Sequence, residues 1–340
     1  NKIKVDYICD KNKISSFSLS QDQAPREHKT QIALLKNNKV YYVSQTVYDK
    51  PTNNVGDLIG QECPDFVYPN YQDYDFVSVD LDAKSLEFAQ KKLSSIADNF
   101  LRLMVFNTLW EMVEGNSLSV EQYVDTILPA LKVEKDLIII SSTLRKLNRS
   151  ASYFYKLSNN EYLNTLDSFL WEQTLKAKSH SDEKKLYFKS FTENAVTEKS
   201  LKELNALIRK EKKIAGLEID QDMRWPIIKK LNSVGFNGSD KILQNEKELD
   251  KSERGQRSAI EAEVARPETK TKDQYFAQLK DKSISLSKHK SIMASFFPVN
   301  QFDMIASYKK QYFDLLSESK NTRDEEFLDA LTDRFVPSDC

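Results

Sequence analysis

The chain has 340 residues, of which 40% are hydrophobic and 30% are charged, and its formal net charge is −1. This composition is typical of a globular protein, and the length exceeds what one ordinary domain needs. A net charge near zero excludes a general electrostatic attraction to nucleic acid or to an anionic membrane. The seven glycines are well below average usage, which indicates a helix-rich chain with few tight β-turns.

Residues 1–82 alternate between apolar and polar side chains, which is typical of short strands. The segment Lys36-Asn37-Asn38-Lys39 predicts a hairpin turn between two of them. The six runs expected as strands are residues 3–9, 14–19, 31–35, 40–47, 66–68 and 76–81. This pattern predicts a small, immunoglobulin-like β-sandwich as the first domain.

From residue 83 to the C-terminus we find only helical signals. About a dozen helices fit, without a strict repeat period, so we predict that residues 83–340 form an irregular HEAT- or armadillo-like α-solenoid. The predicted N-caps are Asp82, Asp98, Ser119, Asp182, Thr197, Ser239 and Asp273, and the predicted helix ends are Gly115, Gly216 and Gly235. The fold class is therefore mainly α with a small N-terminal all-β domain.

The stretch DNFLRLMVFNTLWEMVEG (98–115) is the most informative helix of the chain. Its apolar residues cover nearly every side, so we expect a helix buried on several faces. Ser119 and Gln122 then fit a capping box for the helix that follows. Together the two helices predict a hairpin inside a larger helical array.

Three cysteines, Cys9, Cys63 and Cys340, are odd in number and widely spaced, and they contain no CxxC metal motif. We expect them to be free, with a Cys9–Cys63 bridge as the open alternative. Low cysteine usage favours a reducing compartment, so we expect a cytoplasmic location. No run approaches the ~18 apolar residues needed to span a membrane. The chain starts at Asn1 without a methionine, so we expect the true N-terminus, and any targeting signal, to lie elsewhere.

Five segments in chain order resemble the C-terminal region of the zinc aminopeptidases of the aminopeptidase N type. They are PDFVYPNYQDYDFVSVDLD (64–82), DNFLRLMVFNTLWEMVEG (98–115), DQDMRWPIIKKLNSVG (220–235), RSAIEAEVARPETKTKDQYFAQL (257–279) and FFPVNQFDMIASYKKQYFDLL (296–316). The resemblance covers nearly the whole chain and is to the type shared with endoplasmic-reticulum and puromycin-sensitive aminopeptidases. It implies a β-sandwich that joins a helical lid domain.

The catalytic motif of that family is missing here. The family carries a His-Glu-x-x-His helix, in which two histidines face one zinc and the glutamate serves as general base. This chain has only His28, His180 and His289, none with a second histidine four residues away. We therefore expect no catalytic residue, metal ligand or cofactor in this chain, and zinc in the catalytic domain that would precede it in the parent enzyme.

The resemblance implies a non-catalytic C-terminal part of a zinc metallopeptidase that removes N-terminal residues from peptides. This part would enclose the active-site cavity and hold the distal end of the peptide, and it would be inactive alone. Its expected partners are peptide substrates and the catalytic domain of the same polypeptide, not nucleic acid. The alternative is a free-standing α-solenoid scaffold that binds a protein on its concave face. What precedes Asn1 would distinguish the two.

Arg224 is the first candidate for binding substrate and Arg102 the second, because a guanidinium group matches a peptide carboxylate. Both lie in otherwise apolar helices, where an unpaired charge is costly. The competing interpretation is that each pairs with a carboxylate to fix helix packing, with Asp220 and Asp222 close to Arg224 in sequence. The aromatic pairs and triplets at 153–155 and 296–297 lack a basic stripe, so we expect core packing rather than base stacking.

Overall fold

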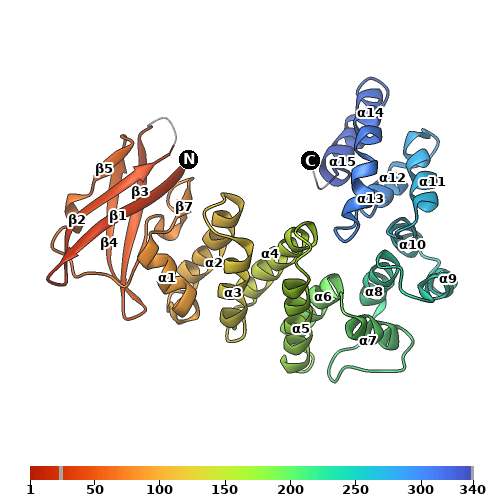
Figure 1. Cartoon of the computed structure of the whole chain (residues 1–340), viewed down its shortest axis with the longest axis horizontal. Helices are drawn as coiled ribbons and strands as arrows, with labels where there is room; N and C mark the ends of the chain where they lie inside the picture. The colour runs from red at the N-terminus through yellow and green to blue at the C-terminus, as the bar shows by residue number, and fades with distance from the viewer. Residues whose placement is uncertain (23–25, 338–340) are drawn as a thin grey trace. The chain divides into compact units, whose positions relative to one another are not determined.

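The computed structural model describes residues 1–22 and 26–337, so Cys340 lies outside the described residues. The chain divides into two compact units, residues 1–147 and 148 onward. The change from strand to helix falls at residues 81–82, as predicted. The fold class is confirmed: an all-β region is followed by helices up to Arg334 (Figure 1). The division into domains at 1–82 and 83–340 stays a prediction.

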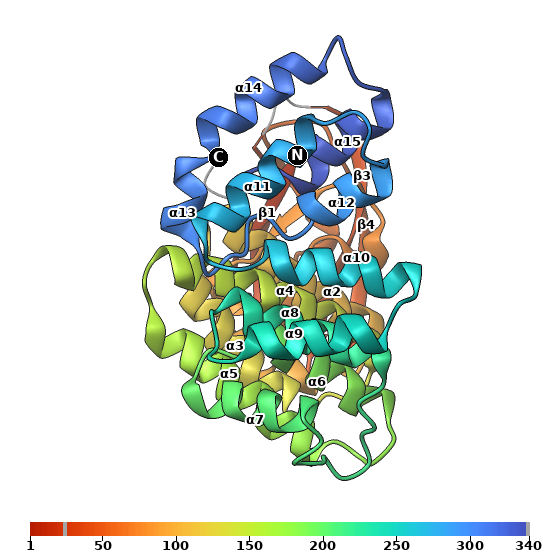
Figure 2. The same cartoon turned by 90° about the vertical axis from the view of Figure 1, so that its right-hand side faces the viewer.

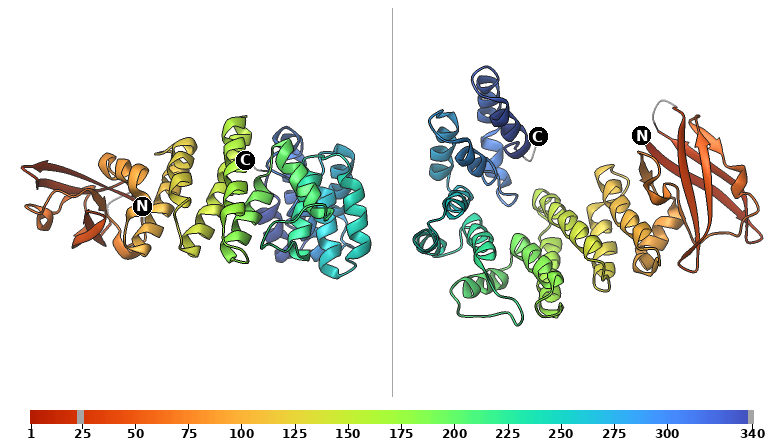
Figure 3. Two further views of the ribbon diagram at one scale, coloured as in Figure 1. Left: turned by 90° about the horizontal axis from the view of Figure 1, so that it is seen from below. Right: turned by 180° about the vertical axis from the view of Figure 1, so that it is seen from behind.

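The strands of the first unit form two sheets, of four strands in the order β5-β2-β1-β7 and three in the order β4-β3-β6. The left panel of Figure 3 shows the two sheets as separate layers. The strands are β1 (Lys2–Asp10), β2 (Lys13–Gln21), β3 (His28–Lys36), β4 (Lys39–Tyr48), β5 (Thr52–Asn54), β6 (Phe66–Tyr68) and β7 (Ser78–Asp80). All six predicted strands are present, and the three-residue β5 was not predicted.

The predicted hairpin turn joins β3 to β4. Asn37 and Asn38 both have positive φ, 49° and 66°, as a two-residue hairpin turn of the favoured hand requires. Asparagine tolerates this left-handed region better than most residues. The turn between β1 and β2 has the same form at Lys11 and Asn12, with φ of 47° and 63°.

Strand β3 is buried along both of its faces from Ile32 to Leu35. Strand β6 pairs with β3 in the same sheet, and the first helix packs against β6. Phe66 of β6 contacts Phe88 of that helix, α1 (Ala83–Lys92), with ring centroids 5.4 Å apart, and the Val67 N–H donates to Ser85 Oγ at 2.9 Å. The sheet and the first helices therefore share one core.

A Cys9–Cys63 disulfide is present, with Cα atoms 5.9 Å apart, so the expectation of free cysteines was wrong for this pair. The two residues are 54 positions apart in the chain. The fold brings them together because the Cys63 N–H donates to the Asn12 carbonyl at 2.9 Å, in the turn that follows β1. Sequence spacing could not show this proximity, which arises from sheet pairing.

Helices make up the rest of the chain. They are α1, α2 (Asn99–Glu114), α3 (Val120–Leu131), α4 (Leu137–Lys156), α5 (Asn160–Lys176), α6 (Asp182–Asn194), α7 (Glu198–Ile208), α8 (Gln221–Ser233), α9 (Ser239–Leu249), α10 (Glu253–Val264), α11 (Thr269–Lys280), α12 (Leu286–Met293), α13 (Phe302–Ser307), α14 (Lys309–Ser319) and α15 (Glu325–Arg334). In the second unit, helices adjacent in sequence pack as neighbours, as α7 to α10 do in Figure 2. Such local packing is what a solenoid of helix pairs requires.

Most predicted helix boundaries are found. Asp82, Asp98, Ser119 and Thr197 cap their helices through side-chain oxygens, and Ser119 with Gln122 forms the expected capping box. Three predicted N-caps were wrong, because α6, α9 and α11 are preceded by other residues. The residues that precede them are Ser181, Gly238 and Glu268.

Two predicted glycine ends differ in their outcome. Gly235, with φ of 64°, follows α8 as predicted. Gly216 ends no helix, since α7 stops at Ile208. It lies instead in a loop against Ser179, where an added Cβ would come within 2.3 Å of the serine Cβ. Only glycine fits this close approach.

The disulfide predicts a measurable contribution to the stability of the first unit. Replacing both Cys9 and Cys63 by serine should lower its free energy of unfolding by about 4 kcal/mol, because the unfolded chain would no longer contain a closed loop of this length. Urea unfolding followed by circular dichroism, with and without a reducing agent, measures the loss. Identical midpoints for the oxidised, reduced and doubly substituted chains would contradict it.

Candidate functional site

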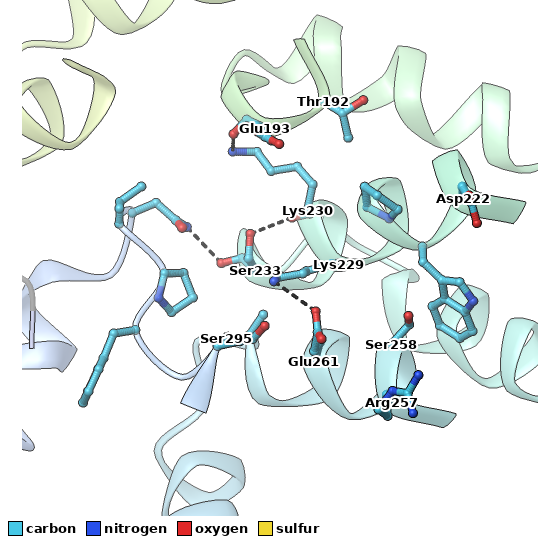
Figure 4. Close-up of a pocket in the computed structure, with 18 of the residues that line it drawn as sticks. Thr192, Glu193, Asp222, Lys229, Lys230, Ser233, Arg257, Ser258, Glu261 and Ser295 are labelled. Atoms are coloured by element: carbon cyan, nitrogen blue, oxygen red, sulfur yellow. Dashed lines mark hydrogen bonds and ion pairs between the residues drawn. The ribbon is translucent and has the colours of Figure 1, made fainter. Parts of the chain in front are cut away.

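The second unit contains a cavity of about 690 Å³, here called the central cavity. Helices α6, α8 and α10 and the segment 294–300 line it. Its volume lies within the range of ligand-binding clefts. The residues whose arrangement defines it are Glu193, Trp225, Lys229, Lys230, Arg257, Glu261, Ser295 and Phe297. Figure 4 shows Glu193, Lys230, Glu261 and Ser295 coming together from these separate elements.

Helix α8 contributes one face to the central cavity. Its lining residues lie at helical intervals of three and four, which places them on one side of the helix. They are Asp222, Trp225, Pro226, Lys229, Lys230 and Ser233. The opposite side carries Ile227, Ile228 and Leu231, all fully buried. One side of the helix therefore packs in the apolar core, and the other side lines the central cavity.

Helix α10 contributes in the same way. Arg254, Arg257, Ser258 and Glu261 follow the same spacing and line the cavity. The segment 294–300 completes the wall and is held by its own side chains. Asn300 Nδ2 donates to the Ser233 carbonyl at 2.9 Å, which ties this segment to the end of α8.

Lys230 is the buried cation of the central cavity, with 9% of its surface exposed. Its ammonium group donates to the main-chain carbonyl of Glu193 at 3.0 Å. Burial lowers the pKa of Lys230 to about 8, against the opposing effect of Asp167 and Glu193. Figure 4 shows Lys230 extending toward Glu193 while Lys229 points to Glu261, from which it lies 3.4 Å.

Ser295 supplies a second unusual group in this cavity. The residue is 3% exposed, and its Oγ has no hydrogen-bond partner within the described residues. A buried hydroxyl without a partner costs free energy, unless a ligand or water supplies one. The central cavity is thus lined by three carboxylates, four cationic side chains and a hydroxyl without a partner among the described residues, beside the aromatic rings of Trp225 and Phe297.

Two further cavities adjoin the central one through shared lining residues. One, of about 610 Å³, lies along α6 and shares Asp222, Pro226 and Arg254 with it. The other, of about 420 Å³, shares Arg257 and Glu261 and extends to α12 and α15. The three cavities are called the groove below. Charged side chains of both signs and apolar side chains line it, as suits a chain of peptide groups.

Arg224 lies on α8 but faces away from the central cavity. Its guanidinium group pairs with Glu246 of α9, with Nε 2.9 Å from Oε1, and also donates to the Ile208 carbonyl at 3.1 Å. The pairing expected with Asp220 or Asp222 does not occur, because Asp220 caps α8 and Asp222 contacts Arg254. A role of Arg224 in binding substrate stays a prediction.

Arg102 repeats this arrangement in the first unit. Its Nε lies 2.7 Å from Glu134 Oε2, Nη2 lies 3.1 Å from Oε1, and Nη1 donates to the Ile96 carbonyl at 2.6 Å. Burial opposes the charge of Glu134, but hydrogen bonds from Arg102 and two main-chain N–H groups keep its pKa below the ordinary value. The observed pairing is structural, and substrate binding by Arg102 stays a prediction.

The three histidines have separate structural roles. His28 lies 3.1 Å from Asp75, His180 is exposed in a loop with φ of 60°, and His289 is buried with its Nε2 3.0 Å from the Gln278 carbonyl. Burial lowers the pKa of His289. Within residues 1–22 and 26–337, no group of three or more His, Cys, Asp or Glu is placed to hold a metal ion.

The prediction of core packing for the aromatic clusters is confirmed for Phe154 and Phe296 but was wrong for Tyr153, which is 39% exposed, while Tyr155 and Phe297 are half-buried. Phe154 is fully buried and stacks on Tyr162 with ring centroids 4.9 Å apart. Phe296 is fully buried in the core formed by α10 to α15. Phe297 departs from the prediction in part, since it also lines the central cavity. Among the described helices, none is long and apolar enough to cross a membrane.

Residues 66–339 match the family described as the ERAP1-like C-terminal domain. The chain belongs to this family. It is also 25% identical over 291 residues to aminopeptidase N of Streptomyces lividans, a match that covers 84% of this chain and 33% of that protein. The chain thus spans about a third of the length of this curated relative. It corresponds to the C-terminal region of an aminopeptidase of the aminopeptidase N type.

One solved structure, Legionella pneumophila aminopeptidase A in complex with aspartic acid, aligns with 98% of this chain and 44% of its own. The sequence identity is 12% and the TM-score is 0.49. The family assignment depends on the match of residues 66–339.

Sequence reasoning missed the residues of the central cavity, although a signal was present. The segment DQDMRWPIIKKLNSVG (220–235) carries part of the family resemblance, and Arg224 is the only residue in it predicted to bind substrate. The residues that line the cavity stand on the opposite side of the same helix, at positions with the same periodicity. A helical projection of α8 would have separated a charged face from an apolar one.

The Arg224–Glu246 pair predicts a stability effect that a substrate-binding residue would not show. Replacing Glu246 by leucine should destabilise the second unit by about 3–5 kcal/mol, because the Arg224 charge would be left buried without its partner. Adding Arg224→Met to that variant should recover part of the loss. Urea unfolding of the two single variants and the double variant measures the coupling. Additive effects without any coupling would show that the pair does not hold α8 in place.

Proposed function

We propose that this chain is the non-catalytic C-terminal part of a zinc aminopeptidase and that its second unit holds the substrate peptide in the groove. Family membership supports the link to an aminopeptidase, and the relative it matches is named as one. The groove is the observation that carries the peptide-binding role. Three adjoining cavities suit an extended ligand better than a compact one.

The proposed catalytic part lies outside this chain. A preceding domain of the parent enzyme would bind the zinc and cleave the N-terminal residue of the peptide. The second unit would enclose the space around that site. Such an enclosure favours peptides that fit and excludes folded proteins. A free-standing scaffold is not favoured by the family assignment.

The disulfide is evidence about the compartment in which the parent protein would be located. Disulfides persist mainly in oxidising compartments, so the Cys9–Cys63 bond favours a location outside the reducing cytoplasm expected from the cysteine count. We propose an oxidising compartment for this protein.

Lys230 predicts a pH dependence of peptide binding. Its amine is charged below a pH of about 8, where it can donate to a carboxylate or carbonyl of the ligand. Affinity for an N-acetylated peptide should therefore fall as the pH rises through 8. Acetylation removes the peptide's own amine from the titration. Fluorescence anisotropy with a labelled peptide, measured across this pH range, provides the test.

Two substitutions and one control separate this effect from others. Lys230→Met should weaken binding about tenfold or more at neutral pH through the loss of a charge-assisted hydrogen bond. Lys230→Arg should remove the pH dependence near 8, because arginine keeps its charge. Lys241→Met, an exposed position of α9 outside the groove, should bind like the unaltered chain. Equal weakening of peptide binding by Lys230→Met and Lys241→Met would contradict the proposal that the peptide binds in the groove.

The chain alone should neither hold zinc nor cleave peptides. The side chains of residues 1–22 and 26–337 include no metal-ligand cluster, so the purified chain should contain zinc far below one equivalent. Metal analysis and hydrolysis of aminoacyl p-nitroanilides measure both properties. Stoichiometric zinc together with turnover would overturn the placement of the catalytic site outside this chain.

A further inference from the structure

The Cys9–Cys63 disulfide has an asymmetric environment. The ammonium group of Lys84 lies 3.5 Å from Cys63 Sγ, close enough to interact with a charge on that sulfur. Cys9 is exposed, whereas Cys63 is half-buried between β1 and α1. The two sulfurs therefore differ both in access and in the charge that faces them.

Lys84 is held in this position by its own contacts. It lies in the first turn of α1, where its N–H donates to the capping carboxylate of Asp82 at 3.1 Å. Its ammonium also donates to the Pro64 carbonyl at 2.6 Å, next to Cys63. The cation thus lies beside the disulfide as part of the fold.

A second cation reinforces the asymmetry. Lys36 donates to the main-chain carbonyl of Cys63 at 2.9 Å and contacts Glu62 at 3.3 Å. Glu62 is the nearest acidic group in sequence, and its charge is partly offset by this contact and by Asn12, which donates to it at 3.2 Å. The ammonium groups of Lys36 and Lys84 thus both lie beside Cys63, and Glu62 is the carboxylate that pairs with Lys36.

From this arrangement we propose that the Cys9–Cys63 bond is a site of S-thiolation, at which a low-molecular-weight thiol forms a mixed disulfide with Cys9 and Cys63 leaves as a thiolate held by Lys84. The attacking thiolate forms a bond to Cys9 Sγ as the Cys9–Cys63 bond breaks. The negative charge moves from the attacking sulfur to Cys63 Sγ, so no external oxidant is consumed. A second thiolate that attacks the mixed disulfide would leave both cysteines reduced and release the oxidised small molecule.

The direction of the reaction follows from physical chemistry. Exchange is faster when the attacked sulfur is accessible and when the leaving thiol has a low pKa. A neighbouring ammonium group stabilises a thiolate and so lowers its pKa. Access favours attack at Cys9 and Lys84 favours departure of Cys63, so both effects select the same product. The inference does not depend on the proposed peptide-binding role, which concerns the other unit.

The test uses the whole chain with Cys340 replaced by serine, incubated with excess reduced glutathione. Aliquots are alkylated with iodoacetamide, digested and mapped by mass spectrometry. The expected early product carries glutathione on Cys9 and the alkyl group on Cys63. Lys84→Met should slow its formation about threefold or more, since each unit of leaving-group pKa changes the rate by roughly that factor.

Two control variants show whether a change in rate comes from the charge beside Cys63. Lys84→Arg keeps a cation beside Cys63 and should react close to the unaltered rate. Lys91→Met removes an exposed lysine of the same helix, paired only with Glu87 among the contacts of the described residues, and should change nothing. Glutathione mainly on Cys63, an even distribution between the two cysteines, or an unaltered rate in Lys84→Met would each overturn the proposal. Circular dichroism of the oxidised variants checks that the fold is intact.

Discussion

The Arg224–Glu246 pair fixes the rotation of helix α8, and the central cavity depends on that rotation. The guanidinium group joins α8 to α9 and to the carbonyl at the end of α7, so three successive helices are tied at one point. Glu246 is almost fully buried, and burial opposes its charge, yet hydrogen bonds from Arg224 and Gln221 keep its pKa below the ordinary value. Because Arg224 faces α9, the residues from Asp222 to Ser233 on the other side face the cavity. A rotation of the helix by about half a turn would exchange the two faces.

Arg102 and Glu134 make the same kind of connection in the first unit, again with a main-chain carbonyl as the third partner. A buried ion pair adds less to stability than its geometry suggests, because both charges are desolvated. Its value lies in specificity, since apolar helices can slide and rotate where a forked hydrogen-bond donor cannot. In a helical array without a strict repeat, such fixed points define which faces remain free for a ligand.

The sequence was sufficient for the fold class, six of seven strands, and the main helix caps, because these depend on local periodicity and on side chains that bond to nearby main chain. It was insufficient where distant segments meet. The Cys9–Cys63 bond, the partner of Arg224 and the close approach of Gly216 to Ser179 all join segments that only the folded chain brings together. The cavity residues of α8 follow a helical period that can be recognised in the sequence. The prediction instead chose Arg224, which lies on the opposite side of the same helix.

Hydrogen exchange of the chain with and without a long, N-acetylated peptide tests the central claim most directly. If the groove holds the peptide, the peptide should slow amide exchange in segment 294–300 and at the ends of α8 and α10, where main-chain groups are least protected by the helices themselves. Helix α9, on the far side of α8, should be unaffected. Protection confined to α9 or to the strands, or none at saturating peptide, would contradict the account.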